Sequence, residues 1–393
     1  MSASKTFTGV FLCALVCLLV YAVLATNFST LTRPFFVSVG SLINQTRDLV
    51  PQKFVSYIPD SLLSSPQVQY VTPQLLPCDW TPQTFLRPTR SQCYVTCNVT
   101  NTVIAFREVP SNVTPSLTSL PANNTSCLKR VIAQHCNCCG RKIPKIAHYV
   151  RFGPYNLSLD AFISVLSVAR FVKPCLIVFH GDSIPHGPYW SALLHLVPNM
   201  VHMHAVKPTE IFGRKIKVVE HAADVKRLRL MIDYGGMYLD IDYMVLRSLD
   251  ELLKESVVLG YEKKGRSICN GFLMSEPNST FMQIWLKNYT DFNDKDWGQH
   301  SVVRPHKISL DYPKLLKVVD TFHKPNYAEM PPFYDRKRVP KYDWSHHYGL
   351  HFYTRVIRKQ FNRKRIDKQD NVIGDMVRHV FYGDSHACNP LYS

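Results

Sequence analysis

The chain has 393 residues, 46% of them hydrophobic, which is enough to bury one substantial core and a small accessory region. It contains 46 Lys and Arg residues against 29 Asp and Glu residues, and the resulting net charge of +17 indicates attraction to anionic partners. Anionic glycans, nucleotide diphosphates and membrane surfaces all fit that description. Nucleic acid is excluded as a partner, because the apolar N-terminal segment and the glycosylation sequons predict a luminal location.

An apolar segment without charged residues runs from Phe7 to Ala25. At roughly 1.5 Å per residue, a helix of this length just spans a hydrocarbon layer of about 30 Å. Lys5 precedes the segment, which favours a cytoplasmic tail at residues 1–6 and a luminal remainder. A cleaved signal peptide is the alternative, since Val23-Leu-Ala25 resembles a small-residue cleavage site. We favour the uncleaved transmembrane anchor at 7–25, because the apolar run is long for a signal peptide.

Residues 26–75 are rich in Ser, Thr, Pro and Gln and show little periodicity, which is typical of a stem that holds a head away from a membrane. Glycosylation sequons are frequent, and most lie in the first half of the chain. They begin at Asn27, Asn44, Asn98, Asn112, Asn123, Asn124, Asn156, Asn278 and Asn288. So many acceptor sites argue for a secretory lumen, where the protein would not meet nucleic acid.

Cysteines concentrate in residues 76–140, which we interpret as a small disulfide-rich module. They are Cys78, Cys93, Cys97, Cys127, Cys136, Cys138 and Cys139. Because their number is odd, one of them pairs outside the module, with Cys175, Cys269 or Cys388, or stays free. The run Cys136-Asn-Cys-Cys139 could alternatively bind zinc, but zinc thiolate sites use two separated pairs, so disulfides are favoured.

From Pro144 onward, strands and helices alternate. Apolar runs predict strands at 145–150, 175–180, 200–205, 257–261 and 268–274. Helical periodicity predicts helices at 157–171, 188–196 and 280–289. This alternation argues for an α/β domain over 141–393, with a mostly parallel sheet flanked by helices. Sheets of this kind bind ligands at the carboxyl ends of their strands.

A further helix is predicted over 217–234, because apolar residues recur there at three- and four-residue steps. Gly235-Gly236 ends this helix, since glycine takes the left-handed conformation that a helix end favours. A short strand is expected from Met237 to Val245. Asp224 and Arg227 lie one turn apart on one side of the helix, where an ion pair within the helix is the simplest interpretation.

Asp240 and Asp242 stand two apart on the expected strand, so their side chains would share a face and reach one hard cation. An isolated Asp-x-Asp is more often a solvated strand end. Here the neighbours are apolar, and partly buried acids are costly unless they are paired or metal-bound. Mn²⁺ or Mg²⁺ prefers oxygen ligands and keeps positions for phosphate oxygens. A cation held there would stabilise the charge on a departing diphosphate.

The run His221-Ala-Ala-Asp-Val-Lys-Arg-Leu-Arg-Leu-Met-Ile-Asp-Tyr-Gly-Gly-Met-Tyr-Leu-Asp-Ile-Asp242 resembles the signature of the DXD-containing glycosyltransferases. Golgi α-1,4-galactosyl- and α-1,4-N-acetylglucosaminyltransferases and the yeast initiating α-1,6-mannosyltransferase belong to that group. An Asp, an Arg three residues on, and Gly-Gly-x-Tyr-x-Asp-x-Asp all occur at matching spacing. The resemblance extends less sharply over roughly 143–310.

This resemblance implies a GT-A-like fold and transfer with retention of anomeric configuration. It implies that Asp242 is the principal metal ligand and that Asp240 contacts the ribose or donor sugar and meets the metal through water. Asp224 and Arg227 would hold hydroxyls of the transferred sugar. The remaining donor-binding positions implied are Gly235, Gly236, Tyr238, Asn270 and Gly271. Gly235 and Gly236 would let the backbone pass close to the nucleotide, and Asn270 and Gly271 would lie near the donor or acceptor cleft.

Two segments depart from the family pattern, namely Trp297-Gly-Gln-His-Ser-Val-Val-Arg-Pro-His306 and Trp344-Ser-His-His-Tyr-Gly-Leu-His351. They leave the acceptor side and the third metal ligand open. His346, His347 and His351 are the candidates for that ligand, with ordinary core or surface histidines as the alternative. Our choice among the three is His347.

We therefore expect a single-pass type II Golgi membrane glycosyltransferase with a luminal catalytic domain. It would move a hexosyl or N-acetylhexosaminyl unit from a nucleotide diphosphate sugar, with a UDP-sugar favoured, to a glycan acceptor on lipid or protein. No general base is assigned, because the leaving phosphate oxygen can take the acceptor proton. One alternative is a catalytically inactive luminal glycan-binding protein, and another is an enzyme that hydrolyses nucleotide sugars.

Overall fold

A computed structural model describes the chain over residues 117–122, 125–136, 140–197, 199–357 and 369–382. The predicted cytoplasmic tail, the anchor at 7–25, the stem and most of the predicted cysteine-rich module lie outside these residues. Among the residues that are described, no helix is both long and apolar enough to cross a membrane.

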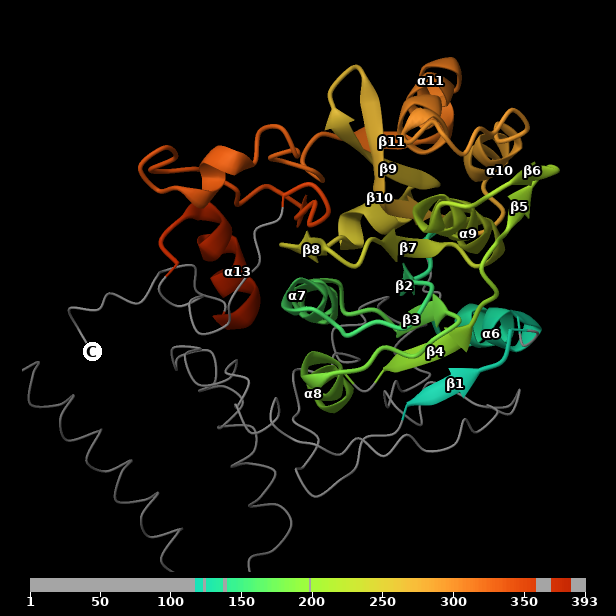
Figure 1. The fold of residues 1–393 in the computed structure, drawn as a ribbon, viewed down its shortest axis with the longest axis horizontal. Coiled ribbons are helices and arrows are strands. Elements are labelled where there is room, and N and C mark those ends of the chain that lie inside the picture. The colour runs from blue at the N-terminus through green and yellow to red at the C-terminus, as the bar shows by residue number, and fades with distance from the viewer. Residues whose placement is uncertain (1–116, 123–124, 137–139, 198, 358–368, 383–393) are drawn as a thin grey trace, which may run out of the picture. The chain divides into compact units, whose positions relative to one another are not determined.

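An eight-stranded sheet forms the centre of the domain (Figure 1). In spatial order its strands are β1 (Thr118–Leu120), β4 (Met200–His204), β3 (Leu176–Gly181), β2 (Ile146–Val150), β7 (Gly236–Leu239), β10 (Ser267–Ser275), β9 (Val257–Lys263) and β11 (Lys317–Val319). The first five strands in this order, β1, β4, β3, β2 and β7, run parallel to one another. Strand β10 is antiparallel to both of its neighbours, and β11 is parallel to β9. The prediction of a mostly parallel sheet is confirmed.

Helices cover both faces of the sheet, as predicted (Figure 1). One face carries α7 (Leu159–Ser167), α8 (Pro188–Leu196) and α13 (Val372–Tyr382). The other carries α6 (Thr125–Val131), α9 (Val219–Asp233), α10 (Thr280–Lys287) and α11 (Arg304–Asp311). Alternate residues of β2 feed the two cores: Ala147 packs with α7 and α8, whereas Ile146 packs with α9.

Two small sheets complete the strand pairing. Strand β8 (Tyr243–Val245) pairs antiparallel with β12 (Gly349–His351), and β5 (Glu210–Ile211) pairs with β6 (Arg214–Lys215). The β8–β12 pair matters for the site, because it brings a late segment of the chain beside the residues that follow β7.

Short helical turns connect the larger elements. They are η3 (Ile132–Cys136), η4 (Val168–Val172), η5 (Asp250–Lys254), η6 (Gln299–Val303), η7 (Pro313–Leu315) and η8 (Pro331–Tyr334). The helix predicted over 157–171 is therefore α7 followed by the wider turn η4, which ends at Lys173 in the left-handed conformation (φ 56°). The helix predicted at 188–196 has those bounds in the structure.

A disulfide joins Cys136, at the end of η3, to Cys175, just before β3. The pairing agrees with the expectation that one cysteine of the predicted module bonds outside it, and Cys175 is one of the three partners considered. It also removes Cys136 from any zinc-binding run. Within the predicted module, β1 extends the large sheet beside β4, and α6 contributes Leu128 and Val131 to the core.

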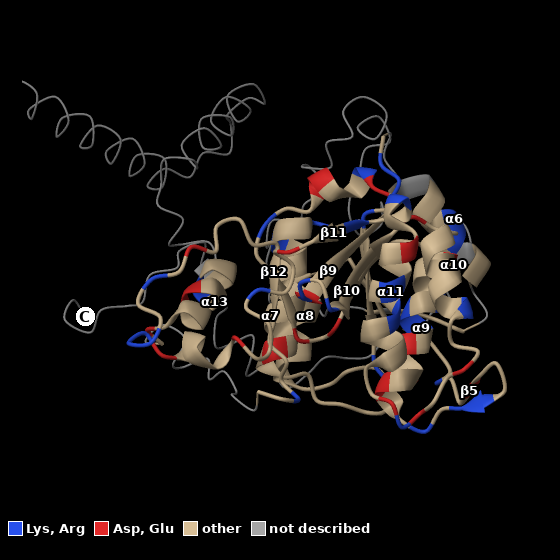
Figure 2. Cartoon of the chain, turned by 90° about the horizontal axis from the view of Figure 1, so that it is seen from above, with Lys and Arg blue, Asp and Glu red and all other residues tan. Residues whose placement is uncertain are grey.

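Basic residues are spread over several elements rather than gathered on one helix (Figure 2). Figure 2 shows Lys and Arg on α6, on α9 and at the β5–β6 hairpin, interspersed with acidic residues. The net charge by itself therefore does not define one binding face on the described domain.

Candidate active site

The connection between α9 and β7 is built by Gly235 and Gly236, whose φ angles are 64° and 92°. A Cβ at Gly235 would lie 2.6 Å from the Pro277 nitrogen, and one at Gly236 would lie 2.5 Å from Ile146 Cγ2. Only glycine fits both the conformation and the space. The close approach is thus to the protein itself, and neither glycine is among the residues that line the site cavity. The close passage of their backbone by a nucleotide, which the resemblance implies, stays a prediction.

Asp240 and Asp242 lie in a turn between β7 and β8, so the prediction of one strand from Met237 to Val245 is wrong at its centre. The Tyr243 N–H donates to the Asp240 carbonyl oxygen at 3.0 Å, and the Asp240 N–H donates to the Gly271 carbonyl oxygen at 2.7 Å. The strand breaks here because the chain leaves the large sheet and joins β12. The two carboxylates nevertheless lie close together, beside His351 of β12.

A cavity of about 540 Å³ opens at this end of β7. Its volume lies within the range of roughly 300–1,000 Å³ that is usual for small-molecule sites. Most of the predicted site residues line it, namely Asp224, Arg227, Tyr238, Asp240, Asp242 and Asn270. The cavity also adjoins the end of β2, so the site falls at the carboxyl ends of parallel strands, as that type of sheet leads one to expect.

Arg227 is the centre of a buried ion-pair network. Its guanidinium lies 3.1 Å from Asp224 Oδ1 and 3.2 Å from Asp240 Oδ1, and it stacks 4.3 Å above the Tyr238 ring. The Tyr238 hydroxyl donates to Asp240 Oδ1 at 2.6 Å. The ion pair expected within the helix is present, and it extends to the first acid of the DXD motif.

Asn270 closes this network from β10. Its side-chain amide donates to Asp224 Oδ1 at 2.7 Å, and its backbone carbonyl oxygen accepts from Arg227 Nη1 at 2.7 Å. Burial, together with the nearby Asp240, raises the pKa of Asp224 even though Arg227 acts to lower it. Burial alone would lower the pKa of Arg227, but Asp240 outweighs it and holds that pKa above its usual value.

Asp242 has a separate set of partners. His351 Nε2 lies 3.1 Å from Asp242 Oδ1, and Thr354 donates to Oδ2 from both its backbone N–H and its hydroxyl, each at 2.9 Å. Burial alone would raise the pKa of this carboxyl, but His351 and Thr354 outweigh it and hold the pKa well below its usual range. Asp242 reciprocally raises the pKa of His351 against the effect of burial.

The pairing of β8 with β12 explains why His351 reaches the acids. Tyr243 stands opposite His351 in this pair, and the Phe352 N–H donates to the Asp242 carbonyl oxygen at 2.9 Å. His351 Nε2 is also 3.8 Å from Asp240 Oδ2. Two carboxylates and an imidazole therefore point at one place, with their candidate ligand atoms within 4.8 Å of one another. The two carboxylates are oxygen donors of the kind that suit Mn²⁺ or Mg²⁺.

The structure places His351, and not His347, beside the two acids. His347 is held elsewhere, with Nδ1 at 3.0 Å from the Lys324 carbonyl oxygen and Nε2 at 3.2 Å from the Tyr342 hydroxyl. The late histidine-rich segment was the correct signal, but only the strand pairing shows which of its histidines faces the acids.

Gly271 has a steric role in the site rather than a place in the cavity wall. A Cβ there would lie 2.8 Å from His351 Cε1 and 2.9 Å from Asp240 Oδ2. The absence of a side chain at this position lets His351 and Asp240 approach each other, and Gly271 is not among the residues that line the cavity.

Sequence reasoning missed the rim of the cavity. Trp297 and Tyr327 line it and are 51% and 47% exposed. Arg355 stacks on Trp297 with its guanidinium carbon 3.9 Å from the ring centroid and forms an ion pair with Glu220 at 2.6 Å. Trp297 opens one of the two segments that depart from the family pattern, so the departure itself was the available signal.

Residues 175–259 match the family model described as the glycosyltransferase sugar-binding region containing the DXD motif. That stretch holds α9, the double glycine and both acids. Over these residues the chain is similar to the DXD-containing glycosyltransferases, which confirms the resemblance that its motifs carry.

Among curated proteins, the glucan organizing enzyme 1 of Cryptococcus neoformans var. grubii is 33% identical over 46% of this chain and 53% of its own length. The human lactosylceramide 4-alpha-galactosyltransferase is 28% identical over 32% of this chain and 35% of its own length. The chain thus spans about half the length of the first and about a third of the second. Among solved structures, the glycosyltransferase GlyE of Streptococcus pneumoniae aligns over 61% of each chain, with 10% identity and a TM-score of 0.40.

Proposed function

We propose that the protein is a metal-dependent retaining glycosyltransferase that moves a hexosyl or N-acetylhexosaminyl unit from a nucleotide diphosphate sugar to a glycan acceptor on lipid or protein. The observation that carries the proposal is the convergence of Asp240, Asp242 and His351 at the edge of a cavity that also contains the Asp224–Arg227 pair. A UDP-sugar is the favoured donor, on the resemblance of the motif, and a GT-A-like fold is part of the proposal.

Asp242 and His351 would be the principal ligands of Mn²⁺ or Mg²⁺, with Asp240 beside them. Bound there, the cation supplies positive charge that stabilises the departing diphosphate. Thr354 fixes the Asp242 carboxylate through two hydrogen bonds, which orients its other oxygen toward His351. Such preorganisation lowers the cost of forming the charged transition state, because the groups need not reorient.

The transferred sugar would lie against α9. Asp224 Oδ1 already accepts from Asn270 and Arg227, which leaves Oδ2 to accept from a sugar hydroxyl. Arg227 is fixed by Asp224, by Asp240 and by the Asn270 carbonyl oxygen. A side chain held on several sides presents its remaining N–H groups in one direction, which favours one arrangement of hydroxyls.

The acceptor would enter over the exposed rings of Trp297 and Tyr327. Aromatic faces pack against the apolar faces of sugar rings, and Arg355 on Trp297 adds hydrogen-bond donors at the rim. The name of the galactosyltransferase relative, which specifies lactosylceramide, supports a glycolipid or other glycan as the class of acceptor. The inactive glycan-binding alternative is less favoured, because both acids and the Asp224–Arg227 pair remain connected in one cavity.

We also propose a Golgi location with the domain in the lumen, anchored through residues 7–25. The Cys136–Cys175 disulfide supports an oxidising compartment, and the sequon asparagines Asn156 and Asn278 are exposed on the domain surface.

Release of nucleoside diphosphate tests the proposal. The full-length chain, made in a secretory host, would be incubated with UDP- and GDP-sugars in the presence of Mn²⁺ or of a chelator. We expect Mn²⁺-dependent release from one donor, lost in Asp242→Ala and kept in Asp233→Asn, a change at an exposed acid at the end of α9. If no donor is bound or cleaved under any condition, the inactive alternative replaces this proposal.

A further inference from the structure

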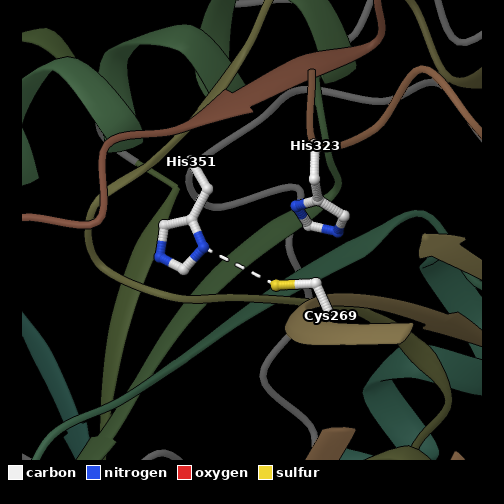
Figure 3. A group of neighbouring side chains, drawn as sticks. All are labelled: Cys269, His323 and His351. Atoms are coloured by element: carbon white, nitrogen blue, oxygen red, sulfur yellow. Dashed lines mark hydrogen bonds between the residues drawn. The ribbon is translucent and has the colours of Figure 1, made fainter. Parts of the chain in front are cut away.

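A second cluster of potential metal ligands shares His351 with the acidic one, and Figure 3 shows its three side chains. Cys269 on β10, His323 after β11 and His351 on β12 bring a sulfur and two ring nitrogens within 4.8 Å of one another. Their exposed fractions are 4%, 0% and 8%. Cys269 is a free thiol, whereas Cys136 and Cys175, also described, are joined to each other.

His323 is the observation that points to a ligand. Both of its ring nitrogens are buried without a hydrogen-bond partner among the described residues. Leaving one buried polar group unpaired is destabilising, so two on one ring call for an explanation. The ring is held in place edge-on to Tyr243 at 5.2 Å, and a Cβ at Gly260 would lie 2.6 Å from His323 Cδ2. The ring is therefore positioned by packing, toward Cys269 and His351 (Figure 3).

The spacing of the cluster fits a tetrahedral cation. Bonds of about 2.3 Å to sulfur and about 2.0–2.1 Å to nitrogen place neighbouring ligand atoms roughly 3.5 Å apart. Cys269 Sγ and His351 Nδ1 are 3.7 Å apart. A thiolate with two imidazoles is a soft donor set that selects zinc-like ions over Mn²⁺ or Mg²⁺. Cys269 and His351 both line the cavity, which gives an ion a route to the cluster.

The two clusters share one side chain. His351 turns Nε2 toward Asp240 and Asp242 and Nδ1 toward Cys269. A neutral imidazole carries a hydrogen on one nitrogen and a lone pair on the other, so it ligates a cation through one nitrogen at a time. When Nε2 ligates, the Nδ1–H points at Cys269 Sγ, as the outward N–H of a metal-bound histidine points at a partner that orients the ring.

We propose that Cys269, His323 and His351 form a second metal site, for a soft divalent cation such as Zn²⁺, whose occupation withdraws His351 from the acidic pair. Zinc would then weaken Mn²⁺ binding at Asp240 and Asp242 by competing for their shared histidine. Binding of zinc to the cluster is independent of the proposed transferase function, whereas the competition rests on it.

Cobalt reports the proposed site directly, because a thiolate bound to Co²⁺ gives a charge-transfer absorption band. The full-length protein titrated with Co²⁺ is expected to show this band. Cys269→Ser is expected to abolish it, and His323→Leu to weaken Co²⁺ binding at least tenfold. His347→Leu changes a buried histidine outside the cluster and is expected to leave the band unchanged. Absence of the band in the unaltered protein, or its persistence in Cys269→Ser, would overturn the proposal.

Thermal unfolding controls for misfolding. Because its ring nitrogens lack partners, His323→Leu is expected to leave the metal-free melting temperature unchanged or to raise it, and to remove the increase that Zn²⁺ gives the unaltered protein. Paramagnetic resonance of bound Mn²⁺ then tests the competition: Zn²⁺ is expected to release Mn²⁺ less effectively in His323→Leu. Equal release in both proteins would refute the competition. A cobalt band without any Mn²⁺ binding would instead refute the proposed function and leave the second site standing.

Discussion

The two acids of the DXD motif are held by different parts of the molecule. Asp240 belongs to a network with Arg227 and Tyr238, which come from the adjoining helix and strand. Asp242 belongs to a network with His351 and Thr354, which come from a segment more than a hundred residues later in the chain. In the first network, one guanidinium lies between two carboxylates. In the second, hydrogen-bond donors contact both oxygens of one carboxylate.

This difference indicates that Asp240 and Asp242 have different roles. Asp240 Oδ1 is already occupied by Arg227 and Tyr238, so the Asp240 network orders the floor of the cavity. Asp242 is oriented toward His351 and is better placed to hold a cation. Disruption of the first network should therefore lower stability as well as activity, whereas disruption of the second should lower activity and metal affinity with less effect on stability.

The largest expected effect on stability comes from Arg227→Met. This change leaves the buried Asp224 and the partly buried Asp240 without their shared cation, and breaking a buried pair in this way costs up to about 3–5 kcal/mol. The free energy of unfolding from denaturant titration measures it. Arg229→Met, at an exposed position on the same helix, serves as the matched control and is expected to change little. A small loss in Arg227→Met would show that the network does not order the cavity.

Asp242→Asn is expected to reduce turnover by about 10²–10³-fold, the usual scale for loss of one preorganised electrostatic group. The unfolding free energy should fall less than in Arg227→Met, because the guanidinium network remains intact. Donor cleavage and denaturant unfolding would be measured on the same preparation. If Asp242→Asn destabilised the protein as much as Arg227→Met and lowered turnover only through unfolding, the division between the two acids would be refuted.

Gly271→Ala tests the point where the two networks meet. The added Cβ would press on both His351 and Asp240, and overpacking of this kind costs about 1–3 kcal/mol. We expect a loss of stability together with weaker Mn²⁺ binding. Gly298→Ala is the control for unfolding, since its Cβ would meet nothing nearer than 3.7 Å. Unchanged Mn²⁺ affinity in Gly271→Ala would argue against a shared metal position.

Thr354→Val should give the smallest effect. It removes the hydroxyl bond to Asp242 and keeps the backbone bond. The free energy of unfolding should therefore fall by no more than about 1.5–3 kcal/mol, the range for one hydrogen bond to a charged group. We expect Mn²⁺ affinity to fall by about tenfold or less and Thr354→Ser to restore it. Failure of the serine variant to restore affinity would assign the effect to packing instead.

The same contrast sets the limit of prediction from sequence. The helix at 219–233, the double glycine and the Asp224–Arg227 pair depend on residues close in the chain, and their periodicity and spacing predicted them. The turn at Asp240–Asp242 was missed because a run of apolar residues reads as one strand whether or not it changes sheets. His351 was not distinguished from His347 because the choice depends on the register of β8 with β12, which pairs distant residues.

The site glycines show a similar limit. The resemblance implies passage of a nucleotide close to Gly235 and Gly236, and a place near the substrate cleft for Gly271. The structure adds that Gly235 and Gly236 accommodate protein neighbours and that Gly271 accommodates His351. Crowding of this kind involves Pro277, Ile146 and His351, which are remote in sequence from the glycines they contact. No local sequence pattern therefore predicts it.

The most direct test of the central claim is the Mn²⁺ affinity of the unaltered protein and of two matched variants, His351→Ala and His347→Ala, by paramagnetic resonance. We expect His351→Ala to weaken Mn²⁺ binding at least tenfold and His347→Ala to leave it unchanged. Loss of affinity in His347→Ala with full retention in His351→Ala would contradict the site described for Asp240 and Asp242.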